Sequence, residues 1–135
     1  MKNQNFTHTD GIKHFTKNIT LECNTPEKYN SNYHIWLLKD GKEQRIRVAV
    51  RNETDSSSPS SHFKFSPTGE YDWVAFLFKF KNGIRSCWII PKDIAIKHTN
   101  ASIEGKLGNK KVSLSIKKLS MKELTAYKDN WHLKQ

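Results

Sequence analysis

The chain has 135 residues, the usual size of one domain, and 36% of them are hydrophobic. No apolar run approaches the roughly 20 residues of a membrane-spanning helix, and the polar segment from Met1 to Asp10 lacks the apolar stretch of a secretory signal. Without such a stretch, we expect a cytoplasmic protein. The formal charge of +10 favours a polyanionic partner, and because nucleic acid is the commonest polyanion, we expect nucleic-acid binding.

The first predicted element is a helix near the N-terminus. Ile12, Phe15 and Ile19 recur at helical spacing, and Thr9 or Asp10 is placed to cap the helix. The pattern therefore predicts one apolar helix face that packs on a core.

A β-hairpin is predicted next. The apolar run from Tyr33 to Leu38 is followed by Asp40-Gly41, a strong turn signal, and by a returning strand from Arg45 to Arg51. In the returning strand, Ile46, Val48 and Val50 alternate with polar or small residues, so one face is apolar. The polar stretch from Asn52 to Ser61 predicts a mobile loop.

A second hairpin follows this loop. The segment from Asp72 to Phe80 is apolar on both faces, as expected for a strand in the middle of a covered sheet. Asn82-Gly83 turns the chain, Ile84 to Ile90 returns, and Pro91 ends the strand. We expect Trp36, Phe76 and Phe78 to lie in the core.

The C-terminal part predicts one more strand and a helix. Val112, Leu114 and Ile116 alternate with serines, and Ser120 to Glu123 matches a capping box. This capping box would form the start of a helix. The helix would pack against the core through one apolar face that carries Leu124, Tyr127 and Trp131.

These elements together predict an α+β fold. Its central mixed sheet has about five strands built from the two hairpins, with flanking helices at both chain ends. Residues 1–11 form a loose lead-in, and residues 12–135 form a single domain.

Basic residues gather on the two hairpins. Arg45, Arg47 and Arg51 alternate with the apolar residues of their strand and so share one face. Arginine suits phosphate oxygens and guanine edges, although a charged face kept only for solubility is the alternative. The predicted nucleic-acid-binding residues are Arg45, Arg47, Arg51, Lys39, Lys42, Lys79, Lys81 and Arg85.

Three short motifs lie within about residues 30 to 132, namely Tyr71-Asp72-Trp73, Trp88-Ile89-Ile90-Pro91 and the segment from Tyr127 to Trp131. Over this range the chain resembles the PD-(D/E)xK, or restriction-endonuclease-like, superfamily. The resemblance implies DNA binding in a restriction, intron or mobile-element system. By the same analogy we expect a homodimer.

The catalytic half of the family pattern is different in this chain. The acidic residue that the family places on its first strand aligns with His34, and its Glu/Gln-x-Lys pair aligns with Ala49 and Arg51. We therefore expect no metal site of the usual kind and no cofactor.

The alternative to a binding module is an active endonuclease that binds magnesium through migrated carboxylates. The candidates are Glu53, Asp55, Glu70 and Asp72, although solvated loop charges are the simpler interpretation.

Three other residues have a structural and a functional interpretation. Phe63 and Phe65 could stack on unpaired bases, but packing beneath the loop is the preferred prediction. His34 is expected to be a hydrogen-bonded core histidine rather than a catalytic one.

A secreted immunoglobulin-like interaction domain is the remaining alternative. The segments that contain Cys23 and Trp36 resemble the B and C strands of an immunoglobulin domain. In that fold a disulfide would join Cys23 to Cys87. Four glycosylation sequons also fit a secreted protein, at Asn5, Asn18, Asn52 and Asn100. The absence of a signal peptide and the predicted C-terminal helix count against it.

Overall fold

The structure is a computed structural model, and not every residue is described. The described residues are 7–19, 21–24, 33–53, 62–67, 69–99, 103–104, 110–119 and 121–134. Most of the predicted loop from Asn52 to Ser61 lies outside them, as do Asp55, Ser120 and the sequons at Asn5 and Asn100.

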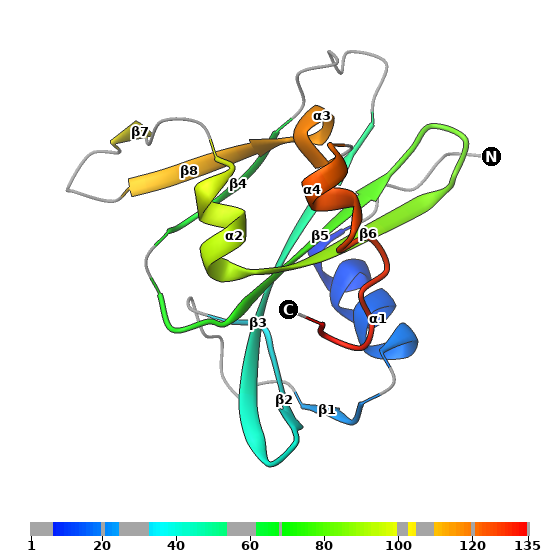
Figure 1. Cartoon of the computed structure of the whole chain (residues 1–135). Coiled ribbons are helices and arrows are strands. Elements are labelled where there is room, and N and C mark those ends of the chain that lie inside the picture. The colour runs from blue at the N-terminus through cyan, green and yellow to red at the C-terminus, as the bar shows by residue number, and fades with distance from the viewer. Residues whose placement is uncertain are drawn as a thin grey trace.

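The main sheet has five strands in the order β1-β2-β3-β5-β6. They are β1 (Cys23–Asn24), β2 (Ile35–Lys39), β3 (Lys42–Asn52), β5 (Trp73–Lys79) and β6 (Arg85–Pro91). β3 and β5 are parallel, whereas the other neighbours are antiparallel. The predicted mixed sheet with the two hairpins at its centre is therefore confirmed (Figure 1).

Both hairpins turn where the sequence predicts. Asp40 and Gly41 have φ angles of 53° and 77°, and Gly83 has a φ angle of 89°. Asp and Gly tolerate these left-handed conformations better than branched residues do. The turn chemistry consequently fixes the register of β2 on β3 and of β5 on β6.

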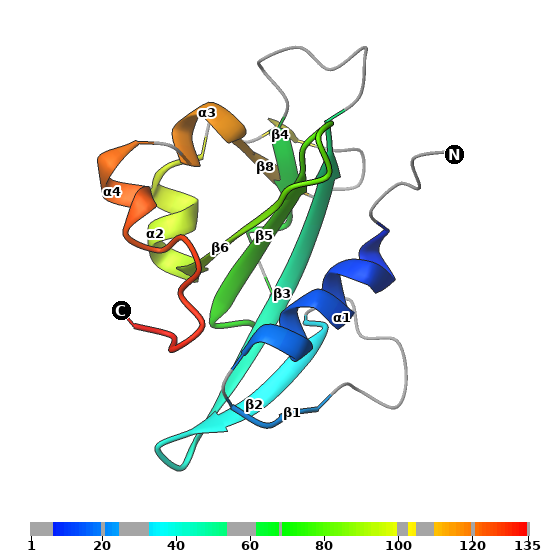
Figure 2. The ribbon, with the colours of Figure 1, turned by 90° about the vertical axis from the view of Figure 1, so that its right-hand side faces the viewer.

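The first helix, α1 (His8–Asn18), covers one face of the sheet (Figure 2). Its cap is Thr7, which forms a reciprocal capping box with Asp10, rather than Thr9 or Asp10 acting as the cap. The first turn of α1 therefore lies within the segment predicted as the lead-in. Phe15 is fully buried in the core between α1 and the sheet, as its spacing predicts.

A close approach between α1 and β3 depends on Gly11. A Cβ atom at this position would lie 2.4 Å from Cγ2 of Val50. Only a glycine lets the helix backbone lie this near the strand, so α1 packs at a fixed point along β3.

The opposite face of the main sheet is covered by a second sheet and three short helices. The second sheet has the order β4-β8-β7. Its strands are β4 (His62–Phe65), β8 (Lys110–Ser115) and β7 (Ile103–Glu104), and the helices are α2 (Lys92–Lys97), α3 (Ile116–Leu119) and α4 (Lys122–Thr125). Figure 2 shows the three helices on the side away from α1.

Two apolar clusters lie on the two faces of the sheet. Trp73, Ala75 and Leu77 of β5 join the α1 side, and Val74 and Phe76 join the other side. The expectation that β5 is covered on both faces is thus confirmed.

The aromatic residues assigned to the core have different outcomes. Phe63 and Phe65 are buried in β4 against Phe76, so their predicted structural role is confirmed. Phe78 is also buried. Trp36 is only half-buried and belongs to neither cluster, because this face of β2 lies beyond the second sheet.

The C-terminal helix is much shorter than predicted. α4 ends at Thr125, and its N-cap is Met121 with no side-chain capping bond. The chain then pairs with the edge of β6, where Ile89 N donates to Tyr127 O and Asp129 N donates to Cys87 O.

The segment after α4 wraps around the edge of β6. Leu124 and Tyr127 contact the cluster on one face, whereas Trp131 contacts the cluster on the α1 side. The three residues were predicted on one helical stripe, and that prediction is wrong because strand pairing replaces the helix.

Two histidines complete the hydrogen bonding of β3 beyond the start of β2. Val48 N donates to Nδ1 of His34 at 2.9 Å, and Nε2 of His8 lies 3.0 Å from Val48 O. Their ring centroids are 4.2 Å apart. The imidazoles therefore satisfy backbone groups that a longer β2 would otherwise pair with. His34 is hydrogen-bonded as predicted, but it is half-buried and belongs to neither core cluster.

The immunoglobulin-like alternative is wrong. Cys23 and Cys87 are both free thiols, and they lie in β1 and β6 at opposite edges of the main sheet. The helices packed on both faces also exclude an all-β sandwich.

Within the described residues, no helix is long and apolar enough to span a membrane.

Candidate nucleic-acid interface

The three arginines of β3 lie on one face of the strand. Ile46 and Val48 face the α1 side and are buried, while Arg45 and Arg47 are half-buried and Arg51 is exposed. Strand alternation places all three arginines on the opposite face. The β3 arginines therefore share a surface, as the sequence predicts.

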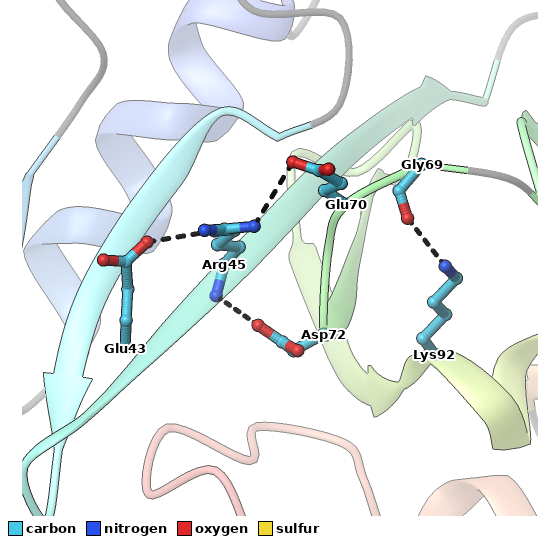
Figure 3. A network of polar contacts seen from close by, with 6 residues as sticks. All are labelled: Glu43, Arg45, Gly69, Glu70, Asp72 and Lys92. Atoms are coloured by element: carbon cyan, nitrogen blue, oxygen red, sulfur yellow. Dashed lines mark hydrogen bonds and ion pairs between the residues drawn. The ribbon is translucent and has the colours of Figure 1, made fainter.

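Arg45 is the centre of an acidic network. Its Nε lies 2.9 Å from Oε1 of Glu43, and its Nη1 lies 3.5 Å from Oε2 of Glu70. Its backbone N–H donates to Oδ2 of Asp72 at 2.9 Å. Figure 3 shows the three carboxylates converging on this one arginine.

The acidic network changes the expected role of Arg45. The hydrogen bond that Arg45 Nε donates to Glu43 is the main reason that the pKa of Arg45 is raised. The ion pair with Glu70 is long, and the Glu70 side chain is 76% exposed, so this pair is weak in water. A phosphate would have to compete with Glu70 for the Arg45 guanidinium.

Tyr71 lies between two cations. The guanidinium carbon of Arg47 is 5.9 Å from its ring centroid, and Nζ of Lys92 is 4.6 Å from it. Lys92 also donates to the carbonyl of Gly69 at 2.7 Å (Figure 3). Burial raises the pKa of Tyr71 to about 12 although Arg47 opposes the shift, so the phenol is neutral.

Sequence reasoning did not select Lys92. It follows the Trp88-Ile89-Ile90-Pro91 motif directly, but no alternation marks it as a neighbour of Arg47. The two residues approach the same Tyr71 ring only because β3 pairs with β5 and β5 pairs with β6.

One end of β3 carries the predicted lysines of the first turn. Lys42 is exposed beside the Asp40-Gly41 turn. Nζ of Lys39 donates to the carbonyl of Leu133 at 2.7 Å, so Lys39 helps to hold the C-terminal segment. Of the two, Lys42 is better placed for a ligand.

The other end of β3 carries a second group, which we call the distal basic group: Arg51, Lys79, Lys81 and Arg85. Lys79 and Arg85 are direct cross-strand partners, and Arg51 pairs with Phe78. Because Lys79 and Arg85 face the α1 side and Arg51 faces away, the group surrounds the end of the sheet. The eight predicted residues are therefore spread along β3 and do not form one compact patch.

Three of the four candidate migrated carboxylates, Glu53, Glu70 and Asp72, are engaged in structural contacts, and Asp55 lies outside the described residues. Oε1 of Glu53 accepts a hydrogen bond from the backbone N–H of Lys81 at 2.9 Å. Glu70 and Asp72 contact Arg45, as described above. Among the described residues, no three His, Cys, Asp or Glu side chains are grouped so that they could hold a metal ion.

A polar cavity of about 430 Å³ adjoins the acidic network. Two carboxylates and one ammonium group line it, together with aromatic, amide and aliphatic side chains: Gln44, Tyr71, Asp72, Trp73, Pro91, Lys92, Asp93 and Ile94. Trp73 Nε1 donates to Oε1 of Gln44 at 2.8 Å on this wall. Asp93 is a second residue that the sequence analysis did not select.

The three positions aligned with the family's catalytic residues have structural roles or surface positions. His34 accepts from Val48 N, and burial is the main cause of its lowered pKa of about 4. Ala49 packs against the cluster beside the second sheet. Arg51 is exposed at the end of β3.

Comparisons with known proteins identify the class of fold. No family model and no curated protein matches the sequence significantly. Solved structures do match, and the one described next shares the α+β fold of this chain.

One of the matching solved structures is that of I-Ssp6803I, a bacterial homing endonuclease. It superposes with a TM-score of 0.58 at 12% sequence identity, over 98% of this chain and 91% of that chain. The likeness therefore extends over nearly the whole fold.

Proposed function

We propose that this protein binds DNA through the basic residues of β3 and of the β5–β6 hairpin. The domain resembles small nucleases of restriction, intron or mobile-element systems, and we propose that it lacks the usual PD-(D/E)xK metal site. The observation that carries the proposal is the position of the cations along β3 in a nuclease-like fold. Arg45, Arg47 and Arg51 share one face of the strand, and Lys42 and the distal basic group lie at its two ends.

The dimensions of β3 fit duplex DNA. Its 11 residues span about 33 Å at roughly 3.3 Å per residue. Ten base pairs of B-DNA span about 34 Å. Arg45 and Arg51, six residues apart on one face of the strand, would lie about 20 Å apart at this spacing, which is within one helical turn of the duplex. A formal charge of +10 would attract the duplex over longer distances.

A salt titration tests the interface residue by residue. Affinity for a 24-base-pair duplex is measured by fluorescence anisotropy at several salt concentrations. Arg51→Ala should lower the slope of log affinity against log salt by about one, because one phosphate contact is lost. Lys97→Ala is the matched control, since Lys97 is an exposed lysine at the end of α2, and it should leave the slope unchanged. Equal slopes for both variants would refute the assignment of Arg51.

Glu70→Gln tests the role of the acidic network, and it should raise the affinity for DNA, whereas Arg51→Ala should lower it. Removing this carboxylate takes away the competitor of phosphate at Nη1 of Arg45, while Glu43 stays bonded to Nε. Affinity at low salt should therefore rise several-fold, about what one weak ion pair contributes. An unchanged affinity would mean that Arg45 makes no phosphate contact.

DNA cleavage is the second candidate function. It is favoured by Asp72 and Asp93, which line one cavity together with Lys92. The described residues supply two carboxylates there, and Asp72 Oδ2 is already bonded to Arg45 N, so the fit to a magnesium site is poor. Plasmid cleavage in magnesium or manganese that Asp72→Asn abolishes would establish this function. The homodimer expected by analogy stays a prediction.

A further inference from the structure

The β5–β6 hairpin ends in an apolar side chain surrounded by cations. Ile84 is 58% exposed at the turn, and Lys81 and Arg85 beside it are exposed as well. Single exposed apolar residues are common on proteins. Ile84 differs because it lies at the end of a projecting ribbon (Figure 1), within the distal basic group.

The hairpin tip is held in one conformation. Phe80 N donates to Ile84 O at 2.8 Å, and Gly83 N donates to Phe80 O at 2.9 Å. The Asn82 side chain accepts from Ile84 N at 3.0 Å. These bonds fix the direction of Ile84, so little conformational entropy is lost when the tip meets a ligand.

Glu53 joins the tip to the end of β3. Its backbone N–H donates to Lys79 O at 2.8 Å, and its carboxylate accepts from Lys81 N at 2.9 Å. The tip is thereby fixed relative to Arg51, whose strand ends one residue before Glu53. A duplex that contacts Arg51 would consequently lie at a defined position against the hairpin.

We propose that the hairpin tip enters the major groove and that Ile84 contacts the C5-methyl group of thymine. This inference rests on the proposed function. A two-stranded ribbon fits the major groove, which is about 12 Å wide, but not the minor groove, which is about 6 Å wide. An apolar side chain carried into the major groove finds one apolar partner on base edges, the thymine methyl. The flanking cations would contact the phosphates on either side.

Replacing thymine by deoxyuridine tests this contact, because it removes only the methyl group. Affinities for poly(dA-dT) and poly(dA-dU) duplexes are compared for the wild type and for Ile84→Ala. The wild type should bind the thymine duplex about three- to sixfold more tightly, the effect of burying one methyl group. Ile84→Ala should bind both duplexes equally. Met121→Ala, which shortens another exposed apolar side chain at 48% exposure on α4, should keep the preference.

The outcomes separate this inference from the proposed function. A thymine preference that persists in Ile84→Ala, or none in the wild type, would overturn the contact while salt-dependent DNA binding remains. Failure of the wild type to bind either duplex would overturn both proposals. Bending of the duplex that depends on Ile84, without a thymine preference, would also overturn it, since that is the behaviour of a minor-groove wedge.

Discussion

Protonation of His34 should loosen the junction between α1, β2 and β3. The Nδ1 atom accepts a hydrogen bond from Val48 N, which a protonated imidazole cannot do. Burial is the main cause that lowers the pKa of His34 from 6.5 to about 4, and the positive charges of His8 and Arg47 add to the effect. The folded protein therefore favours the neutral ring.

The size and sign of the effect follow from this shift. The folded-state pKa is lower than the unfolded one, so the unfolded chain binds more protons between pH 6.5 and 4. The stability that His34 contributes is complete above pH 6.5 and falls as the pH drops towards 4. The difference between pKa values of 6.5 and about 4 corresponds to at most about 3 kcal/mol. Because the ring is only half-buried, water reduces this to about 1–2 kcal/mol.

His34→Asn is the matched variant. The Asn Oδ1 atom occupies a position like that of Nδ1 and can accept from Val48 N, but it does not titrate. Urea unfolding is followed by tryptophan fluorescence at pH 7.5 and 4.5. The free energy of unfolding of the wild type should fall by about 1–2 kcal/mol more than that of the variant. Equal losses in the two proteins would refute the reasoning. His14, whose pKa is also lowered chiefly by burial, is present in both and cancels.

Three further predictions concern packing and thiols. Gly11→Ala should destabilise the fold by about 1–3 kcal/mol in urea unfolding, because the new methyl group would clash with Val50. Val50→Ala in the same chain should recover part of this loss. Full stability of Gly11→Ala alone would contradict the close approach of α1 to β3. Asn130→Ala should cost about 2–3 kcal/mol by the same assay, because the buried Asn130 side chain makes three hydrogen bonds to the backbone, one to Ile89 O of β6 and two with Lys134. A neutral effect would mean that water replaces these bonds. Thiol titration without reductant should find two thiols in the denatured chain and no reaction of Cys87 in the native one, since its burial raises the pKa of the thiol; fewer than two would indicate a Cys23–Cys87 bridge.

Local chemistry explains what the sequence predicted correctly in the main sheet. The Asp40-Gly41 turn adopts the left-handed conformations that these residue types favour. The alternation in β3 assigns Ile46 to the core and Arg45 to the other face. Both features depend on residues within a few positions of one another, so a single sequence contains the signal.

Long-range pairing explains what the sequence could not predict. The parallel contact of β3 with β5 joins residues 27 positions apart, such as Ile46 and Trp73, and periodicity carries no information on which strands pair. The C-terminal helix stops at Thr125 because Tyr127 and Asp129 bond to β6. That competing strand edge is invisible in the local pattern.

The same limitation applies to the candidate interface. Alternation correctly placed Arg45, Arg47 and Arg51 on one face. The partners of Arg45, Glu70 and Asp72, come from a segment 25 to 27 residues later in the chain. The competition between carboxylate and phosphate at Arg45 therefore emerges only from the tertiary structure.

The most direct test of DNA binding is the salt dependence of wild-type affinity for a mixed-sequence 24-base-pair duplex. The cations along β3 and the β5–β6 hairpin would make about four to six phosphate contacts, so log affinity should fall linearly with log salt with a slope of about −4 to −5. A slope near zero, or no binding at about 50 mM salt, would contradict the proposal that this basic surface binds DNA.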